Sequence, residues 1–335
     1  MKKTRILIAV AKEDNERKDI SDVLRCKNSI LNVLSKKNIK TGVLFVERKD
    51  FNNTSKLKKT ILNKNPHCIF NLFEGFGDEP FREADFAEIL ERTNIPFTGN
   101  PSFALRACLD KAKAKNILKK MGIPVPAGIV VKNIKNLKMN NLNFPVFVKP
   151  CSEDASVGID KDSLVYSERK LPGVLRKRLK KFSKGIIVED FLPGAEYSVA
   201  FLGNNKYEVL GVSMIDYSLY KKMPLFLTYA SKWEEKTDEF KKIMPSCGAS
   251  IDKSLKKRII NLAKEAANAL GCRGYFRVDL RTKGGKIFII DVNPNPDINV
   301  DSGYVKQADQ SGYSYPEIIE KIIQLSGATE ALIYH

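Results

Sequence analysis

The apolar positions of the first hundred residues follow two alternating periods. Short apolar runs predict three strands, at residues 5–10, 41–46 and 68–73. Apolar residues at helical spacing predict three helices, over residues 23–35, near 57–62 and over 84–91. Strands that alternate with helices in this way are typical of a small parallel α/β sheet.

Two polar loops follow this sheet, and the pattern then changes. Residues 75–81 come directly after the third predicted strand, at the edge where open α/β sheets bind ligands, and residues 97–101 form a second loop of the same kind. A lysine-rich helix then ends at Gly122, with Pro124 and Pro126 beyond it. The later strands have an antiparallel pattern with interspersed helices. We expect the first domain to end in this connecting stretch, at residue 107.

Polar side chains gather on a hairpin near the C-terminus. Two apolar runs, residues 274–280 and 287–293, flank a Gly-Gly turn and predict two paired strands. Alternation places Arg277 and Asp279 on one face of the first strand, and Asp291 and Asn293 on one face of the second. Oxygen donors without a nearby His or Cys suit Mg²⁺. The alternative is that these residues only end strands and begin turns; we favour the metal, because buried strands rarely carry several acids without a partner.

Two further segments have residues suited to binding a nucleotide. The strand at residues 144–150 carries Lys149 near its end, and the small polar loop that follows, residues 151–158, could enclose phosphates with its backbone N–H groups. This loop matches neither G-x-x-x-x-G-K-[ST] nor G-x-G-x-x-G. Around the strand at residues 186–192, Glu189 and Glu196 are either solvated or part of a site in which the backbone reads an adenine edge and Glu196 holds ribose.

Composition indicates a cytoplasmic enzyme with more than one domain. A chain of 335 residues with 43% hydrophobic residues can fill two or three cores. Six scattered cysteines argue against a zinc site or a disulfide framework and favour a reducing compartment. We expect residues 1–11 to form a first strand rather than a signal peptide, and no apolar run approaches membrane-spanning length.

The net charge of +18 raises the hypothesis of nucleic-acid binding. The lysines are spread along the whole chain without interleaved aromatic residues, so nucleic acid is not the partner we expect. We interpret the densest basic run, residues 176–184, as one solvated helix face. The two histidines, His67 and the terminal His335, leave almost no room for His-centred catalysis.

Taken in order, a set of short motifs resembles the ATP-grasp superfamily and is most similar to its D-alanine:D-alanine ligase branch. The resemblance runs from about residue 66 to about residue 322. Each motif is weak alone, and the ordered set at plausible spacing is specific. The motifs are Asn71-Leu-Phe-Glu-Gly75, Ile95-Pro-Phe-Thr-Gly99, Leu109-Asp-Lys111, Gly122-Ile-Pro-Val-Pro126, Val148-Lys-Pro150, Ser156-Val-Gly158, Val188-Glu-Asp-Phe-Leu-Pro-Gly194 with Glu196, Arg277-Val-Asp279 and Asp291-Val-Asn293.

This resemblance implies a three-part ATP-grasp fold, with an α/β domain at residues 1–107 and ATP between subdomains at 108–184 and 185–328. It also implies an ATP-dependent carboxylate-amine ligase that acts through an acyl phosphate and needs ATP and two Mg²⁺ ions, with Mn²⁺ as a possible substitute. A homodimer through the first domain would suit the family. By position, the implied nucleotide contacts are Lys111, Lys149 and Ser156 at the phosphates, Glu189, Phe191 and Leu192 around adenine, and Glu196 at ribose.

The same resemblance assigns the catalytic, metal and substrate positions. Arg277 would stabilise the acyl phosphate and the oxyanion, and Lys232 would approach the γ-phosphate from a mobile loop. The implied metal ligands are Asp279, Asp291 and Asn293. The implied substrate residues are Glu74, Asp297 and Ser302.

Several positions depart from the D-alanine ligase pattern, all on the amino-acid side. Residues 11–16 lack the family's Glu- and Ser-bearing glycine motif, Ala155 and Trp233 replace a Ser-Tyr pair, and Asp297 replaces a glycine. We therefore expect amino acids or a short peptide other than D-alanine as substrates, one with an extra amino or guanidino group facing Asp297. A non-amino-acid carboxylate, a catalytically silent nucleotide-binding regulator and a nucleic-acid binder are the alternatives.

Overall fold

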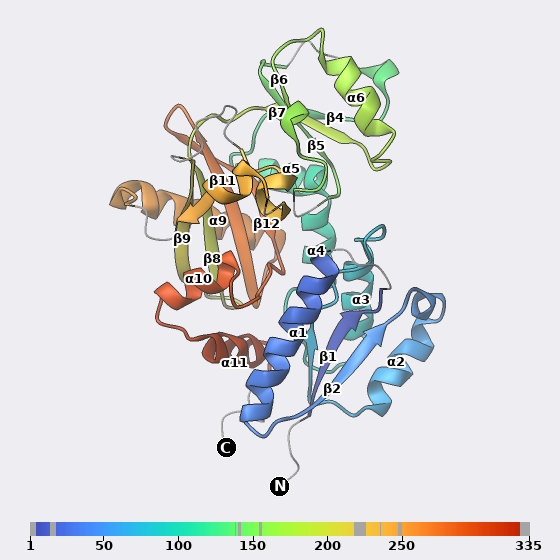
Figure 1. Cartoon of the computed structure of the whole chain (residues 1–335). Coiled ribbons are helices and arrows are strands. Elements are labelled where there is room, and N and C mark those ends of the chain that lie inside the picture. The colour runs from blue at the N-terminus through green and yellow to red at the C-terminus, as the bar shows by residue number, and fades with distance from the viewer. Residues whose placement is uncertain are drawn as a thin grey trace.

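The N-terminal part of the chain folds as a parallel α/β sheet. The computed structural model describes residues 5–13, 18–137, 139, 142–153, 156–217, 226–234, 236–246 and 250–328. The sheet has the order β2-β1-β3, and all its strands are parallel (Figure 1), which confirms the predicted alternation. Its elements are β1 (Arg5–Ala11), α1 (Lys18–Lys36), β2 (Lys40–Val46), a 3₁₀ turn (Arg48–Asn52), α2 (Thr54–Asn63), β3 (Cys68–Asn71) and α3 (Arg82–Glu91).

A second, antiparallel sheet follows, with the order β4-β7-β5-β6. Since β7 pairs with β4 and β5, this sheet continues past residue 184, where we placed a domain boundary. The three domain ranges remain predictions. The elements are β4 (Gly128–Val131), a 3₁₀ turn (Ile134–Asn136), β5 (Val146–Pro150), a 3₁₀ turn (Lys161–Ser163), β6 (Leu164–Val165), α6 (Leu171–Leu179) and β7 (Ile186–Asp190).

The third sheet has five antiparallel strands in the order β10-β9-β8-β11-β12. Its strands are β8 (Glu196–Leu202), β9 (Glu208–Asp216), β10 (Met244–Ser246), β11 (Tyr275–Lys283) and β12 (Lys286–Asn293). The helices of this part are α7 (Tyr229–Trp233), α8 (Asp238–Lys242), α9 (Lys253–Leu270), α10 (Gly303–Gln310) and α11 (Tyr315–Leu325). None of the helices in the described ranges is long and apolar enough to cross a bilayer.

The predicted hairpin near the C-terminus is confirmed by β11 and β12. Its turn residues Gly284 and Gly285 have φ values of +56° and +74°, the left-handed conformation that a tight hairpin turn requires and that glycine adopts without strain. In the register, Arg277 lies opposite Asn293 and Asp279 lies opposite Asp291. The four polar side chains singled out in the sequence therefore form two cross-strand pairs that are neighbours on the same face of the hairpin.

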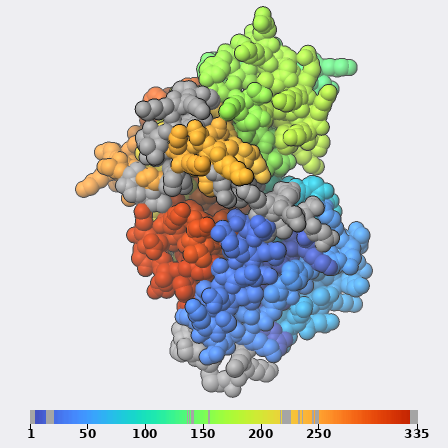
Figure 2. Space-filling model, in the orientation of Figure 1, coloured from blue at the N-terminus to red at the C-terminus, as the bar shows by residue number. Residues whose placement is uncertain are grey.

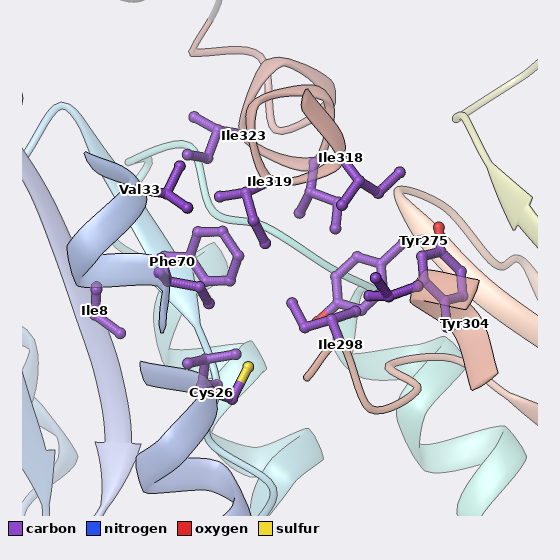
Figure 3. Packing of buried hydrophobic residues seen from close by; sticks show 14 of the residues in the cluster. Ile8, Cys26, Val33, Phe70, Tyr275, Ile298, Tyr304, Ile318, Ile319 and Ile323 are labelled. Atoms are coloured by element: carbon purple, nitrogen blue, oxygen red, sulfur yellow. The ribbon is translucent and has the colours of Figure 1, made fainter. Parts of the chain in front are cut away.

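The first and third parts share one hydrophobic core. Figure 3 shows Ile318, Ile319 and Ile323 of α11 gathered around Phe70 of β3, with Tyr275 of β11 close by, and these residues belong to one buried cluster. On the face drawn in Figure 2, the blue N-terminal part and the red C-terminal helices are in contact, while the green second sheet stands above them. Two walls of the site described next are therefore packed together.

The connecting helices α4 (Ser102–Leu109) and α5 (Lys111–Lys120) are anchored to the third sheet. Ala114 and Leu118 of α5 belong to the same buried cluster as α9, β8 and β11. The side chain of Asp110 caps α5, because its Oδ1 accepts hydrogen bonds from the backbone N–H groups of Ala112 and Lys113 at 3.1 and 3.0 Å. Lys111 is thus the first residue of a well-fixed helix.

Candidate functional site

A cleft of about 1420 Å³ is lined by residues of all three parts. Strand residues such as Lys149 on β5 and Asp279 on β11 line it together with loop residues such as Glu74, which follows β3. Apart from Lys232, whose side chain lies outside the described residues, every site residue predicted from the sequence lines this cleft. The fold therefore brings together positions that are far apart in the sequence.

The hairpin forms the polar floor of the cleft around Asp279. The Asp279 carboxylate accepts two hydrogen bonds from Arg277, from Nε and Nη2 at 2.9 Å each, and others from Ser198 Oγ at 2.8 Å and Asn293 Nδ2 at 3.0 Å. Asp291 lies beside this network with its Oδ2 3.2 Å from Lys111 Nζ. Burial alone would lower the pKa of Arg277, but Asp279 outweighs it and the pKa is raised. Arg277 is therefore a permanent cation in the cleft.

A buried chain of alternating charges lies beside the hairpin, on β5, β7 and α5. Lys149 Nζ is 3.0 Å from Glu189 Oε1 and donates to the Ile290 carbonyl oxygen at 3.3 Å, and Lys115 Nζ contacts the other oxygen of Glu189. Burial lowers the pKa of Lys149 to about 8. Burial also lowers the pKa of Lys115 well below its ordinary value, with contributions from Lys149 and Lys111. Two poorly solvated ammonium groups therefore share one carboxylate.

Lys115 was not among the residues predicted from the sequence. Its spacing could have identified it, because it follows Lys111 by four residues in a helix and so lies on the same face. The same helix also carries Lys113, which is exposed. Helical spacing from Lys111, which we predicted to contact the phosphates, was thus the missed signal.

A cluster of aromatic residues lines the cleft next to these charges. Phe147 stacks on Phe191 with ring centroids 6.3 Å apart, and Phe226 meets Phe147 edge-on at 5.0 Å. The guanidinium of Arg281 lies over Phe191 at 5.3 Å and is 3.7 Å from Glu196. This combination of flat apolar surface and a buried carboxylate suits a nucleoside, with the base among the aromatic rings and the sugar near Glu196.

The last residues of the predicted phosphate loop, from Ser156 on, begin a tight turn that lines the cleft. Ser156 has a φ of +64°, and the Ile159 N–H donates to the Ser156 carbonyl oxygen at 3.0 Å. On the other side, the Tyr229 N–H at the start of α7 donates to the Ile159 carbonyl oxygen at 3.0 Å. The expectation for Ala155 lies outside the described residues, as do the side chains of Lys232 and Trp233 on α7.

We call the region lined by Lys111, Lys149, Glu189, Glu196, Asp279 and Asp291 the nucleotide side. The region lined by Asp22, Arg25, Glu74, Asp297, Asp301 and Ser302 is the substrate side. Arg277 is within electrostatic reach of both sides. Asp279 and Asp291 on the nucleotide side and Asp297 on the substrate side all raise its pKa.

The substrate side is built from loops and helix ends. Arg25 of α1 holds Asp301 through two contacts of 3.1 and 3.0 Å and also pairs with Asp22 at 3.0 Å. Asp297 is exposed, and its Oδ1 accepts from the N–H and Nδ2 of Asn299 at 2.8 Å each. Burial raises the pKa of Asp22, with Asp297 and Asp301 acting in the same direction and Arg25 opposing them. This side therefore has a negative local potential.

Two residues at this end have evident structural partners. Ser302 is buried and caps α10, because its Oγ accepts from the Val305 N–H at 3.2 Å. Glu13, in the segment that lacks the family's glycine motif, accepts from the Gly77 N–H at 3.1 Å and from Arg48 at 3.0 Å. Glu74 is exposed and lines the cleft. The capping hydrogen bond is thus one role of Ser302 that needs no substrate.

Comparison with known proteins identifies the family. A family model described as the D-ala D-ala ligase C-terminus matches residues 117–324. The D-alanine–D-alanine ligase of Carboxydothermus hydrogenoformans is 30% identical over 247 residues, which cover 71% of this chain and 75% of that protein. The D-alanine–D-alanine ligase of Glaesserella parasuis is 30% identical over 266 residues, which cover 77% of this chain and 80% of that protein. The chain belongs to the D-alanine–D-alanine ligase family.

Solved structures agree with this membership at the level of the fold. A D-alanine–D-alanine ligase from Bacillus anthracis complexed with ATP has a TM-score of 0.75 at 21% identity and covers 96% of this chain and 97% of its own. A D-Ala:D-Ser ligase from Enterococcus faecalis has a TM-score of 0.74 at 20% identity and covers 97% and 99%. The ATP-grasp fold predicted from the sequence is confirmed. This member of the D-alanine–D-alanine ligase family is an ATP-dependent, ADP-forming ligase that makes a peptide-like bond.

Proposed function

We propose that this ligase joins the carboxylate of one amino acid or short peptide to the amine of a second, and that one of the two substrates carries an additional cationic group. The observation that supports this most strongly is the contrast between the two sides of the cleft. The nucleotide side carries the buried lysines and carboxylates described above, whereas acids predominate on the substrate side in a chain of net charge +18.

On the nucleotide side, each proposed role follows from burial and charge. Lys111 and Lys149 are held with little freedom beside carboxylates, and they would bind ATP phosphates as point charges. Glu189, Phe191 and Leu192 would surround the adenine, and the contact with Lys115 would keep the Glu189 carboxylate in place. Glu196 would accept hydrogen bonds from ribose hydroxyls, and the backbone N–H groups near Ser156 would contact phosphate oxygens. Lys232 keeps its proposed approach to the γ-phosphate.

The residues of the hairpin fit Mg²⁺. The set contains two carboxylates and an amide oxygen on adjacent cross-strand pairs, and Asn293 turns its Nδ2 toward Asp279, which leaves the amide oxygen as its ligating atom. Asp279, Asp291 and Asn293 would hold the ion, whose remaining positions suit phosphate and water oxygens. When bound, Mg²⁺ would neutralise charge on the transferring phosphoryl group. Two ions, and Mn²⁺ as a substitute, remain our expectation.

The chemistry needs no nucleophile from the protein. A substrate carboxylate oxygen attacks the γ-phosphorus of ATP, the bond to the β-phosphate oxygen breaks, and ADP leaves. The amine nitrogen then attacks the acyl carbon, the carbon–oxygen bond to phosphate breaks, and the amine gives up a proton. Arg277 lies where the two sides meet and would stabilise the negative charge on the acyl oxygen. The lysines and Arg277 thus contribute positioning and charge.

The substrate side supports a cationic substrate. When the lining residues Glu13, Glu83 and Lys306 are added to the set that defines the substrate side, acids outnumber bases by six to two. The acids are Glu13, Asp22, Glu74, Glu83, Asp297 and Asp301, and the bases are Arg25 and Lys306. A separate observation concerns Asn299, which is 2% exposed, lines the cleft and has a buried Oδ1 without a hydrogen-bond partner. This oxygen is out of reach of solvent, so the case for a cationic substrate rests on the lining acids. An ammonium or guanidinium group near the exposed carboxylate of Asp297 would offset their negative charge.

A screen of amino-acid pairs tests this function. Purified protein with ATP and Mg²⁺ would be assayed for ADP release across pairs that combine alanine, serine, lysine, ornithine, arginine and short peptides in both stereochemical forms. Product mass then identifies the bond formed. We expect ADP release that depends on both substrates and a product mass equal to their sum less water. ADP release without a condensation product, or with non-amino-acid carboxylates alone, would contradict the proposal.

A further inference from the structure

One arginine of the basic run at residues 176–184 is buried, contrary to our interpretation of that run as a solvated helix face. Arg178 of α6 is 5% exposed, whereas Arg176 and Lys177 of the same helix are exposed. A guanidinium so far from water needs partners, because burying an unpaired charge is very costly. Its partners therefore indicate what the residue does.

The three acceptors of Arg178 lie at the end of the phosphate loop and in the turn that follows it. Its Nη1 donates to the Gly158 carbonyl oxygen, and its Nη2 donates to Asp160 Oδ1 at 2.6 Å and to Ser163 Oγ at 3.0 Å. Asp160 and Ser163 also cap the short 3₁₀ turn between them, with the Asp160 N–H donating to Ser163 Oγ at 3.1 Å. One planar guanidinium thus fixes a backbone carbonyl and both ends of a turn.

The end of the phosphate loop, from Ser156 to Gly158, has little conformational freedom. Gly158 has a φ of +74°, and a Cβ at this position would lie 2.6 Å from Phe182 and 2.7 Å from Pro150. The hydrogen bond from the Ile159 N–H to the Ser156 carbonyl closes the turn. A displacement of Gly158 would therefore move Ser156 as well.

The same segment holds α7. The Tyr229 N–H donates to the Ile159 carbonyl, and the residues just before and within α7 are fixed by a buried cap, in which Thr228 Oγ1 accepts from the Ser231 N–H at 3.1 Å and donates to Glu239 at 2.7 Å. Arg178 does not line the cleft itself. Its contacts thus lie behind the loop at residues 156–159, which in turn is bonded to α7.

We propose that Arg178 is a positioning residue that holds residues 156–159, at the end of the phosphate loop, in place for phosphate binding and, through the Ile159–Tyr229 hydrogen bond, sets the place of α7. The inference rests on the proposed phosphate-binding function of this loop. It assigns Arg178 no contact with substrate or nucleotide. Loss of its contacts should impair recognition of the phosphates and leave recognition of the nucleoside intact.

The test compares ATP with adenosine, which lacks the phosphates. Calorimetry would measure the Kd of each for the wild type, Arg178→Lys, Arg178→Met and the matched control Arg176→Met, an exposed arginine on the same helix. We expect ATP affinity to fall about tenfold or more in Arg178→Met, since several hydrogen bonds to a charged group are lost, with partial rescue in Arg178→Lys. Adenosine affinity should stay within about twofold of wild type, and Arg176→Met should match wild type for both ligands.

A second readout uses Trp233, the single tryptophan of the chain, which lies in α7. Acrylamide quenching of its fluorescence without nucleotide should increase in the Arg178 variants and stay unchanged in Arg176→Met. If Arg178→Met does not fold, Arg178→Lys decides, because it keeps a cation beside Asp160. Equal ATP affinity and equal quenching, or a parallel loss of ATP and adenosine affinity, would overturn the proposal. A wild type that binds adenosine and ATP equally would instead contradict the proposed function.

Discussion

The two sides of the cleft differ in how their charged groups are held. On the nucleotide side, Lys111, Lys149 and Glu189 are buried and lie on strands or at the start of a capped helix. On the substrate side, Asp297 and Asp301 are exposed and lie in the loop between β12 and α10. Buried charges are costly to rearrange, whereas exposed loop charges can be replaced at little cost in stability. We therefore propose that the buried charges hold the groups for phosphoryl transfer in place and that the exposed loop charges set substrate selectivity.

The largest effect is expected from Asp291→Ala. This change removes a proposed Mg²⁺ ligand and the partner of Lys111, so turnover should fall by at least about a hundredfold, the range typical for loss of a charge-stabilising group. Far-ultraviolet circular dichroism should remain that of wild type. The control is Asp162→Asn, which removes an exposed acid paired with Lys177 at 3.5 Å. Equal ADP-release rates for Asp291→Ala and wild type would contradict the metal assignment.

Lys149→Ala tests the contribution of one buried charge of the nucleotide side to ATP binding. Loss of one charged hydrogen bond to a phosphate should weaken ATP binding by about 1.5 to 3 kcal/mol. Calorimetry of ATP binding measures this directly. The exposed Lys177→Ala serves as the control, and a change in ATP-binding free energy below about 0.5 kcal/mol in Lys149→Ala would contradict a contact between Lys149 and a phosphate.

The pH dependence of ATP binding follows from the same residue. Burial lowers the pKa of Lys149 from 10.5 to about 8, so its ammonium group loses its proton as the pH rises through that value. ATP binds the charged form, and the contribution is therefore nearly complete at about pH 7, half lost near pH 8 and almost absent at about pH 9. Between pH 7 and pH 9 the Kd should rise about tenfold, and this rise should be absent in Lys149→Ala. A wild-type Kd that is constant over this range would rule out Lys149 as the titrating group.

Part of this site could be predicted from the sequence because strand alternation and register are local properties. Alternation predicted the shared face of Arg277 and Asp279 and that of Asp291 and Asn293, and the register then pairs Arg277 with Asn293 and Asp279 with Asp291. The contact between Arg25 and Asp301 could not be predicted, because 276 residues separate them and only the shared core of the first and third parts brings them together. Burial of Arg178 was also missed, although it follows the buried Leu171 and Leu175 at helical spacing, because the basic run was read as one solvated face.

The smallest expected effect concerns Ser302, for which structure and substrate binding give different expectations. As the cap of α10, Ser302→Ala should lower the free energy of unfolding by about 1 kcal/mol. Ser302→Asp restores a capping oxygen and should recover stability, but its added negative charge should raise the KM of a substrate bound through its carboxylate. Denaturant unfolding and steady-state kinetics separate the two roles. An unchanged KM in Ser302→Asp would leave Ser302 with the capping role alone.

The most direct test of the proposed cationic substrate compares ornithine with norvaline as the second substrate, since the two differ only by a terminal amino group. We expect kcat/KM for ornithine to exceed that for norvaline by about tenfold or more in the wild type, as one charged hydrogen bond would give. In Asp297→Asn the ratio should fall toward one, with the KM for ATP unchanged. Equal use of both amino acids by the wild type, or D-alanine used as efficiently as ornithine, would contradict the assignment of the substrate side.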